Sequence, residues 1–144
     1  MYVTKENPVI QEVRSYETNL DRAYKENKKI KTFYPTKHLI TRWFNIFNQE
    51  IFNNEIYPFH EIEILQKKGC HAEHIPYEEH DGKIYGVLSI TDRFINKNEF
   101  LYTLAHEMIH QWQWMTLTRT SHGNSFWKWK NKLAQFEIPL GESI

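Results

Sequence analysis

One short motif constrains this chain more than any other feature. Residues 106–110 read His-Glu-Met-Ile-His, and the apolar residues around them recur with helical spacing over about 98–117. Four residues make about one helical turn, so His106 and His110 project from the same face, where two imidazoles can bind one Zn²⁺. Glu107 lies about 100° further round the helix, beside such a metal rather than on it. A general base that takes a proton from a zinc-activated water needs that position.

The motif alone is a modest signal. In a chain of this length and composition, roughly 0.05 chance matches are expected, and histidines so spaced often form a surface or core pair. The surrounding helix argues against both, because a full apolar stripe lies opposite the histidines: Leu101, Leu104, Ala105, Met108, Trp112 and Met115. The metzincin variant of the motif is excluded, since it requires glycine and histidine where this sequence has Gln113 and Thr116.

A third histidine follows at a useful distance. His122 lies twelve residues after His110 and is followed directly by Gly123, which allows a tight turn. Catalytic zinc commonly takes three protein ligands and keeps one position for water. We therefore expect His122 to be the third ligand, at the start of the last helix, with Glu137 and Glu142 as rival candidates.

The rest of the chain predicts an α+β fold in a single domain, because strands cluster between helices instead of alternating with them. Asn98 is the expected N-cap of the motif helix. The Asp81-Gly82 dipeptide predicts a tight hairpin turn. The expected order is helices over about 8–24 and 36–53, strands over 61–64, 70–79 and 84–90, then helices over 98–117 and from about 122.

The stretch FLYTLAHEMIHQWQW, together with SHGNSFWKWKNKL after it, resembles the core of the SprT-like zinc metallopeptidases, to which the Spartan proteases belong. In that family a helical HExxH motif is followed by a His-Gly pair and an aromatic residue that opens the next helix, here Phe126. FNIFNQEIFNNEIYP (44–58) and IYGVLSIT (84–91) are similar to the helix and strand that precede the active-site helix. The resemblance covers about residues 37–136.

This resemblance implies a compact zincin-like core, with N-terminal helices, a small three-stranded sheet and a C-terminal helix that carries the third ligand. It implies a metallopeptidase domain over 36–140. Residues 1–35 fall outside the resemblance, and the helical spacing of their apolar residues predicts an N-terminal helical extension. The resemblance also implies that His106, His110 and His122 are zinc ligands and that Glu107 is the general base. The expected activity is hydrolysis of peptide bonds in a protein or peptide substrate.

Two other functions remain open. The first is a metal-stabilised binding or regulatory module without turnover, although such a site has no need of an acid between its histidines. The second is a DNA-associated protease. Residues 108–136 favour it, because they contain four basic residues and no acid: Arg119, Lys128, Lys130 and Lys132. The formal net charge of +0 opposes it.

Several residues near the motif could have a role in substrate binding. Tyr85, Tyr102 and Arg119 are candidates for stabilising an oxyanion. Trp114 falls on the histidine side of the helix and could line a substrate groove. The strand Ile84–Ile90 could pair with an extended peptide if it lies at a sheet edge, or could be central and already paired on both sides.

A second metal site is a weaker possibility. One cysteine and three histidines form a loose cluster, but their spacing matches no closed zinc site, so we expect ordinary polar hairpin residues: Cys70, His71, His74 and His80.

The composition indicates where in the cell the protein can be expected. The chain has no apolar run long enough to span a membrane and no signal-peptide pattern at its start. Its single cysteine cannot form an internal disulfide. We expect a cytoplasmic protein without a membrane partner.

Overall fold

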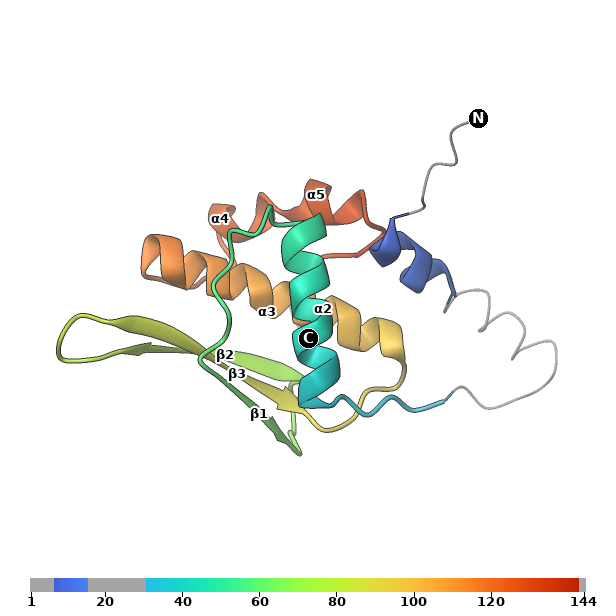
Figure 1. The fold of residues 1–144 in the computed structure, drawn as a ribbon, viewed down its shortest axis with the longest axis horizontal. Coiled ribbons are helices and arrows are strands. Elements are labelled where there is room, and N and C mark those ends of the chain that lie inside the picture. Colours follow the sequence, from blue (N-terminus) through green and yellow to red (C-terminus); the bar gives the residue numbers. More distant parts are fainter. Residues whose placement is uncertain (1–6, 16–30, 143–144) are drawn as a thin grey trace.

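The computed structural model describes residues 7–15 and 31–142, and these form the mixed α+β fold that the sequence predicts. A three-stranded sheet lies on one side of a long central helix, and two short helices lie on the other (Figure 1). Residues 8–15 form a further helical segment near the start of the chain. The named elements are α2 (Lys37–Glu50), β1 (Glu61–Leu65), β2 (Ala72–Glu78), β3 (Ile84–Thr91), α3 (Lys97–Leu117), α4 (Asn124–Trp127) and α5 (Lys130–Ala134).

The strand β3 is the central strand of the sheet, paired in parallel with β1 and antiparallel with β2. This settles the question left open by the sequence: the segment 84–90 offers no free edge, and β2 and β1 are the edge strands. The hairpin between β2 and β3 turns at Gly82, as predicted, with φ of 85°. Its closing hydrogen bond runs from the Glu79 N–H to the Lys83 carbonyl at 2.8 Å.

Side-chain caps begin both long helices. The Thr36 Oγ1 accepts from the Leu39 N–H at 3.1 Å, at the start predicted for α2. For α3 the predicted cap is wrong by two residues. Asn96 is the N-cap and accepts from the Glu99 N–H at 2.9 Å. Asn98 lies inside the helix, where its buried side chain donates to the Val13 carbonyl at 3.3 Å.

The helix α3 is buried around most of its circumference, so the expectation of one core-facing stripe opposite the histidines is too simple. The sheet covers one side, and α2 and α4 pack on others (Figure 1). His106, Glu107 and His110 are therefore buried along with the apolar residues of the helix. None of the helices in the described ranges is long and apolar enough to cross a membrane.

The N-terminal helical segment packs on the core. Val9 and Val13 are fully buried among core residues. Glu12 forms an ion pair with Lys97 at the start of α3, and Arg14 pairs with Glu137 at 2.7 Å. The remainder of the helix predicted over 8–24 lies outside the described residues beyond position 15.

Candidate metal centre

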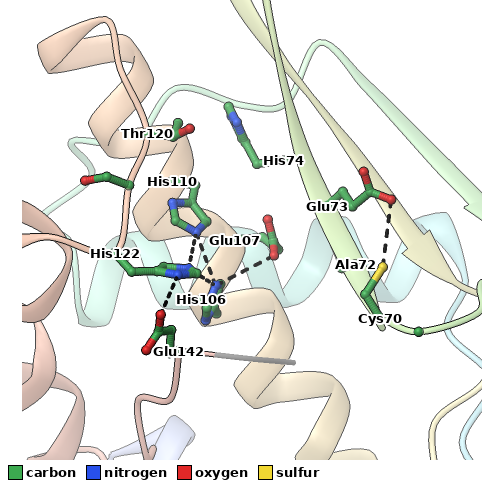
Figure 2. Close-up of a pocket in the computed structure, with 12 residues that line it drawn as sticks. Cys70, Ala72, Glu73, His74, His106, Glu107, His110, Thr120, His122 and Glu142 are labelled. Carbon is green, nitrogen blue, oxygen red and sulfur yellow. Dashed lines mark hydrogen bonds and ion pairs between the residues drawn. The ribbon is translucent and has the colours of Figure 1, made fainter.

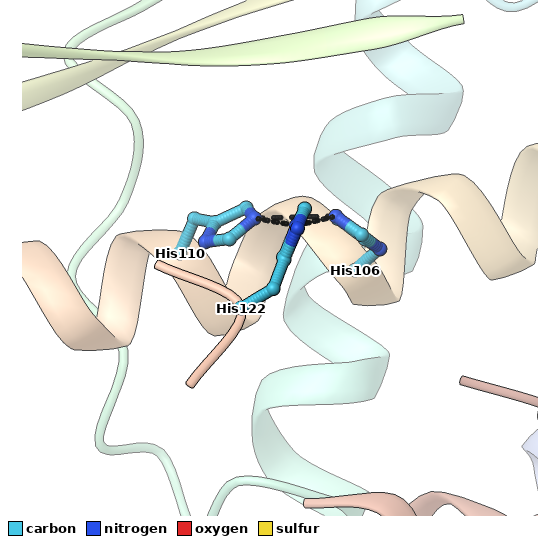
Figure 3. A group of neighbouring side chains, drawn as sticks. All are labelled: His106, His110 and His122. Atoms are coloured by element: carbon cyan, nitrogen blue, oxygen red, sulfur yellow. Dashed lines mark hydrogen bonds between the residues drawn. The ribbon is translucent and has the colours of Figure 1, made fainter. Parts of the chain in front are cut away.

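Three histidine side chains converge on one point beside α3. The Nε2 atoms of His106 and His110 lie 3.2 Å apart, and the Nε2 atom of His122 lies 3.2 Å from His110 and 3.3 Å from His106 (Figure 3). The sequence placed the first two on one helical face, and the structure brings the third to them. Together these three residues could hold a metal ion.

The triangle of nitrogens matches the dimensions of a tetrahedral zinc site. Ligand nitrogens bind zinc at about 2.0–2.1 Å, which separates two of them by about 3.3–3.4 Å at the tetrahedral angle. Hydrogen bonding among the rings explains the convergence less well. One proton on one Nε2 cannot point at two other nitrogens at once, so three lone pairs directed at a common point fit a shared cation better.

Each ring has a further polar neighbour, and the one at His110 favours this orientation. His110 Nδ1 donates to Gln113 Oε1 at 2.7 Å. His106 hydrogen-bonds the backbone of Gly141, which leaves its Nε2 for the cluster. His122 Nδ1 lies 3.9 Å from a Glu142 carboxylate oxygen (Figure 2). Metal-binding histidines usually have such partners, which set the tautomer and orient the ring.

Burial keeps His106 and His110 uncharged. It lowers the pKa of His106 to about 3, with the neighbouring His110 and His122 acting in the same direction. Burial also lowers the pKa of His110 to about 4, against the opposing hydrogen bond to Gln113. Neutral imidazoles with free lone pairs are the form that binds metals.

Glu107 is a buried carboxylate beside the cluster. The residue is 2% exposed, and its Oε1 lies 4.0 Å from His106 Nε2. Its other oxygen, Oε2, is buried without a hydrogen-bond partner. Burial, reinforced by the charge of Glu73, raises the pKa of Glu107 to about 8. A buried carboxyl group with one oxygen lacking a hydrogen-bond partner is costly to stability, and such costly groups are common where they have a chemical role.

The cluster opens into a cavity of about 440 Å³. Figure 2 shows the three histidines and Glu107 on one side of it, with the start of β2 on the other. His122 is the most exposed of the three histidines and stands at the cavity mouth. The lining residues are Gly69, Cys70, Ala72, Glu73, His74, His106, Glu107, His110, Thr120, Ser121, His122 and Glu142.

The structure places His122 in a loop, and not on the C-terminal helix as expected. Gly123 is the N-cap of α4, so His122 precedes the first turn of that helix. The rival ligands lie elsewhere. Glu137 is paired with Arg14, and Glu142 approaches the Nδ1 side of His122 and not the point where the three Nε2 atoms meet.

The loose cluster of one cysteine and three histidines does not assemble. The Cys70 Sγ contacts a Glu73 carboxylate oxygen at 3.8 Å. His71 packs against Phe94, with ring centroids 5.3 Å apart, and His80 lies on the exposed hairpin turn. Within residues 7–15 and 31–142, only the group around His106 has the spacing of a metal site.

The residues suggested for substrate contact lie away from the main cavity. Tyr85 stacks on Tyr77, with ring centroids 5.2 Å apart, and Arg119 is exposed on the loop after α3. Tyr102 lines a separate cavity of about 340 Å³ next to His106. Trp114 is 9% exposed and donates from Nε1 to the Tyr85 carbonyl at 3.0 Å, so it attaches α3 to the sheet and does not line a groove there.

Sequence reasoning missed two glutamines of α3 that organise the surroundings of the cluster. Gln113 is fully buried and bonds His110, and Gln111 is 1% exposed and bonds His74. Their position in the sequence could have indicated this role. Gln111 and Gln113 closely follow the second motif histidine, and polar side chains on a buried helix need hydrogen-bond partners.

Comparison with known proteins agrees with the motif analysis. The SprT-like family model matches residues 40–142, which is more than half of the 144-residue chain. A comparison with curated proteins found no match.

Proposed function

Because the chain belongs to the SprT-like family, we propose that it is a zinc-dependent peptidase that hydrolyses peptide bonds with water. One observation carries the proposal: a buried acid, Glu107, lies directly beside three converging histidine nitrogens. The family match and the donor set support it independently, one from the sequence as a whole and the other from local geometry.

His106, His110 and His122 would hold the ion through their Nε2 atoms. When bound, Zn²⁺ would polarise the scissile carbonyl and lower the pKa of water toward neutrality. The protein contributes the orientation of the His110 ring, since the bond from its Nδ1 to Gln113 Oε1 turns its Nε2 lone pair toward the other two histidines.

Glu107 would act as the general base. Its carboxylate takes a proton from the attacking water as the new C–O bond forms, and passes it to the leaving nitrogen as the C–N bond breaks. The pKa of about 8 favours the protonated carboxyl when the centre carries no charge. A cation held by the three histidines would favour the ionised form, so the acid would be a competent base when the centre is loaded.

An extended peptide would pair with the open edge of β2. The Thr91 N–H donates to the His71 carbonyl and the Glu79 N–H to the Lys83 carbonyl. Given the register of the hairpin, the odd-numbered residues of β2 bond β3, and the backbone groups of Ala72 and His74 point outward. The His74 N–H faces the Glu107 carboxyl, so the backbone of Ala72 and the carbonyl of His74 are left for a peptide. Both residues line the main cavity, so a peptide paired there crosses the metal centre.

The test is to compare wild type with Glu107→Gln for zinc content and for cleavage of unfolded casein. The amide has the volume of the acid but cannot accept the proton, so we expect bound zinc to persist and cleavage to fall by about 10²–10⁴-fold. Glu63→Gln is the control, because Glu63 is exposed on β1 and does not line the cavity. Undiminished cleavage by the Glu107 variant would remove the residue from this role.

A second candidate is a metal-stabilised binding module. The observation that favours it is that the cluster joins α3 to the loop before α4, so a bound ion would stabilise the fold without turnover. It predicts that zinc raises the melting temperature of wild type and Glu107→Gln alike, with no cleavage by either.

A further inference from the structure

The side-chain amide of Gln113 joins two of the three histidines. Its Oε1 accepts from His110 Nδ1 at 2.7 Å and from the Ser121 N–H at 3.3 Å. Its Nε2 donates to the Ser121 carbonyl at 3.1 Å and to Ser125 Oγ at 2.8 Å. Gln113 is 0% exposed, and these four bonds use both donors and both acceptor positions of the amide.

The bonds also determine which way the amide faces. Because the Ser121 carbonyl can only accept, the amide nitrogen must face the loop and Oε1 must face His110. His110 must then carry its proton on Nδ1, which leaves the Nε2 lone pair for the cluster. One side chain thus sets the tautomer of one histidine and holds the backbone next to another, since Ser121 directly precedes His122.

The loop that carries His122 has few other attachments. Residues 116–124 are exposed, and Thr118 ends α3 in the left-handed region with φ of 56°. In the described part of the chain, the hydrogen bonds from residues 119–121 to the body of α3 run through Gln113. The Ser121 hydroxyl then accepts from the Gly123 N–H at 3.2 Å, which extends the support past His122.

We propose that Gln113 is a positioning residue that couples the second and third histidines, so that His122 reaches the metal only because the loop is attached to the residue that orients His110. The inference rests on the metal centre of the proposed function. It goes beyond orientation of a single ligand, because the Ser121 carbonyl needs a donor from the amide, whereas His110 and the Ser121 N–H need its oxygen.

Two substitutions separate these sides. Gln113→Leu removes both, and Gln113→Glu keeps an acceptor for His110 but places a carboxylate oxygen against the Ser121 carbonyl. We expect both to lower zinc affinity by about 10- to 100-fold, measured by competition with a chromophoric chelator. If orientation of His110 were the whole role, Gln113→Glu would bind zinc at least as tightly as wild type, and the proposal would be overturned.

Gln111→Leu is the matched control. Gln111 lies two positions earlier on the same helix, is 1% exposed and bonds His74 and two backbone carbonyls, and no hydrogen bond of its amide goes to any of the three histidines. We expect it to lower the melting temperature of metal-free protein as much as Gln113→Leu, with zinc affinity close to that of wild type. Equal losses of zinc affinity in both variants would assign the effect to general destabilisation and contradict the proposal.

The coupling itself is tested in a His122→Ala background. There, Gln113→Glu should cost no further zinc affinity, because the loop no longer delivers a ligand; an undiminished cost would overturn the proposal.

Ser125→Ala, which removes one acceptor on the loop side, serves if the glutamine variants do not fold, and should weaken zinc binding while leaving the His110 contact in place. If wild type binds zinc but cleaves no peptide, the proposed peptidase activity is refuted and this inference stands. If wild type binds no zinc, both proposals are overturned.

Discussion

Gly86 on β3 faces Gln111 on α3 so closely that a β-carbon at position 86 would overlap Gln111 Oε1. The same β-carbon would overlap His74 Nε2, which bonds that oxygen at 2.7 Å. The amide nitrogen of Gln111 donates to the Tyr57 and Pro58 carbonyls at 3.1 and 3.2 Å. The missing side chain therefore leaves room for a polar contact that joins the sheet, the edge strand and the segment before β1 to the motif helix.

Gly86→Ala should destabilise the protein by about 1–3 kcal/mol, because neither the β3 backbone nor the anchored amide can move away without breaking hydrogen bonds. Urea unfolding monitored by tryptophan fluorescence measures the change. In a Gln111→Ala background the same substitution should cost less, since the amide is gone. Unchanged stability of Gly86→Ala in the wild-type background would show that the contact is looser than the structure has it.

The assignment of the third ligand predicts a contrast between two neighbouring residues. His122→Ala should weaken zinc binding strongly, because two imidazoles remain, whereas Glu142→Ala should have a small effect. The Glu142 side chain is 73% exposed and lies 3.9 Å from His122 Nδ1, so water screens its charge. Elemental analysis of both variants after dialysis against a mild chelator measures retained metal. The opposite ranking would make Glu142 the ligand.

The features that local spacing determines were predictable. The spacing of His106 and His110 depends only on the pitch of a helix, and Gly82 follows from the demands of a tight turn. The central position of β3 was not predictable, because a short apolar strand has the same pattern wherever both its faces are covered. The cap of α3 was misplaced for a related reason: Asn96 and Asn98 are chemically equal, and only contact with Val13 buries the second.

The surroundings of the cluster were less accessible to sequence reasoning because they depend on long-range contacts. Gln113 meets Ser121 across a loop, and Gly141 reaches His106 from the end of the described chain. Nothing in the local sequence around any of these residues specifies its partner. The buried environment of Glu107 likewise depends on β2, whose position over α3 the motif does not encode.

Three lysines after the motif lie near aromatic rings, and Lys128 is the closest of them. Lys128 Nζ lies 3.9 Å from the centroid of the Trp112 ring, well within cation–π range. Lys128→Met keeps the apolar stem and loses the charge, and should destabilise the protein by about 0.5–1 kcal/mol. Lys130→Met is the control, since Lys130 lies 6.0 Å from the Trp127 centroid, at the limit of such contacts. Thermal denaturation measures both, and equal effects would contradict a specific contact.

His74 predicts how the stability of the metal-free protein changes with pH. Burial lowers the pKa of His74 from its usual 6.5, against the opposing hydrogen bond to Gln111. Its neighbours include His110, with ring centroids 6.5 Å apart, and the carboxyl of Glu107, which the His74 backbone N–H approaches. Well above pH 6.5 the side chain is neutral in both the folded and the unfolded chain, so it adds no pH dependence there.

As the pH falls below 6.5, the unfolded chain binds a proton at His74 that the folded chain does not, so the free energy of unfolding falls. The slope is at most about 1.4 kcal/mol per pH unit for one proton. His74→Gln keeps a donor for Gln111 and removes the titration, so its stability should fall less steeply between pH 6.5 and 5. Urea unfolding in the presence of a chelator measures both slopes, and subtraction removes the contributions of the other histidines. Parallel profiles would mean that His74 takes up its proton in the folded protein as readily as in the unfolded chain.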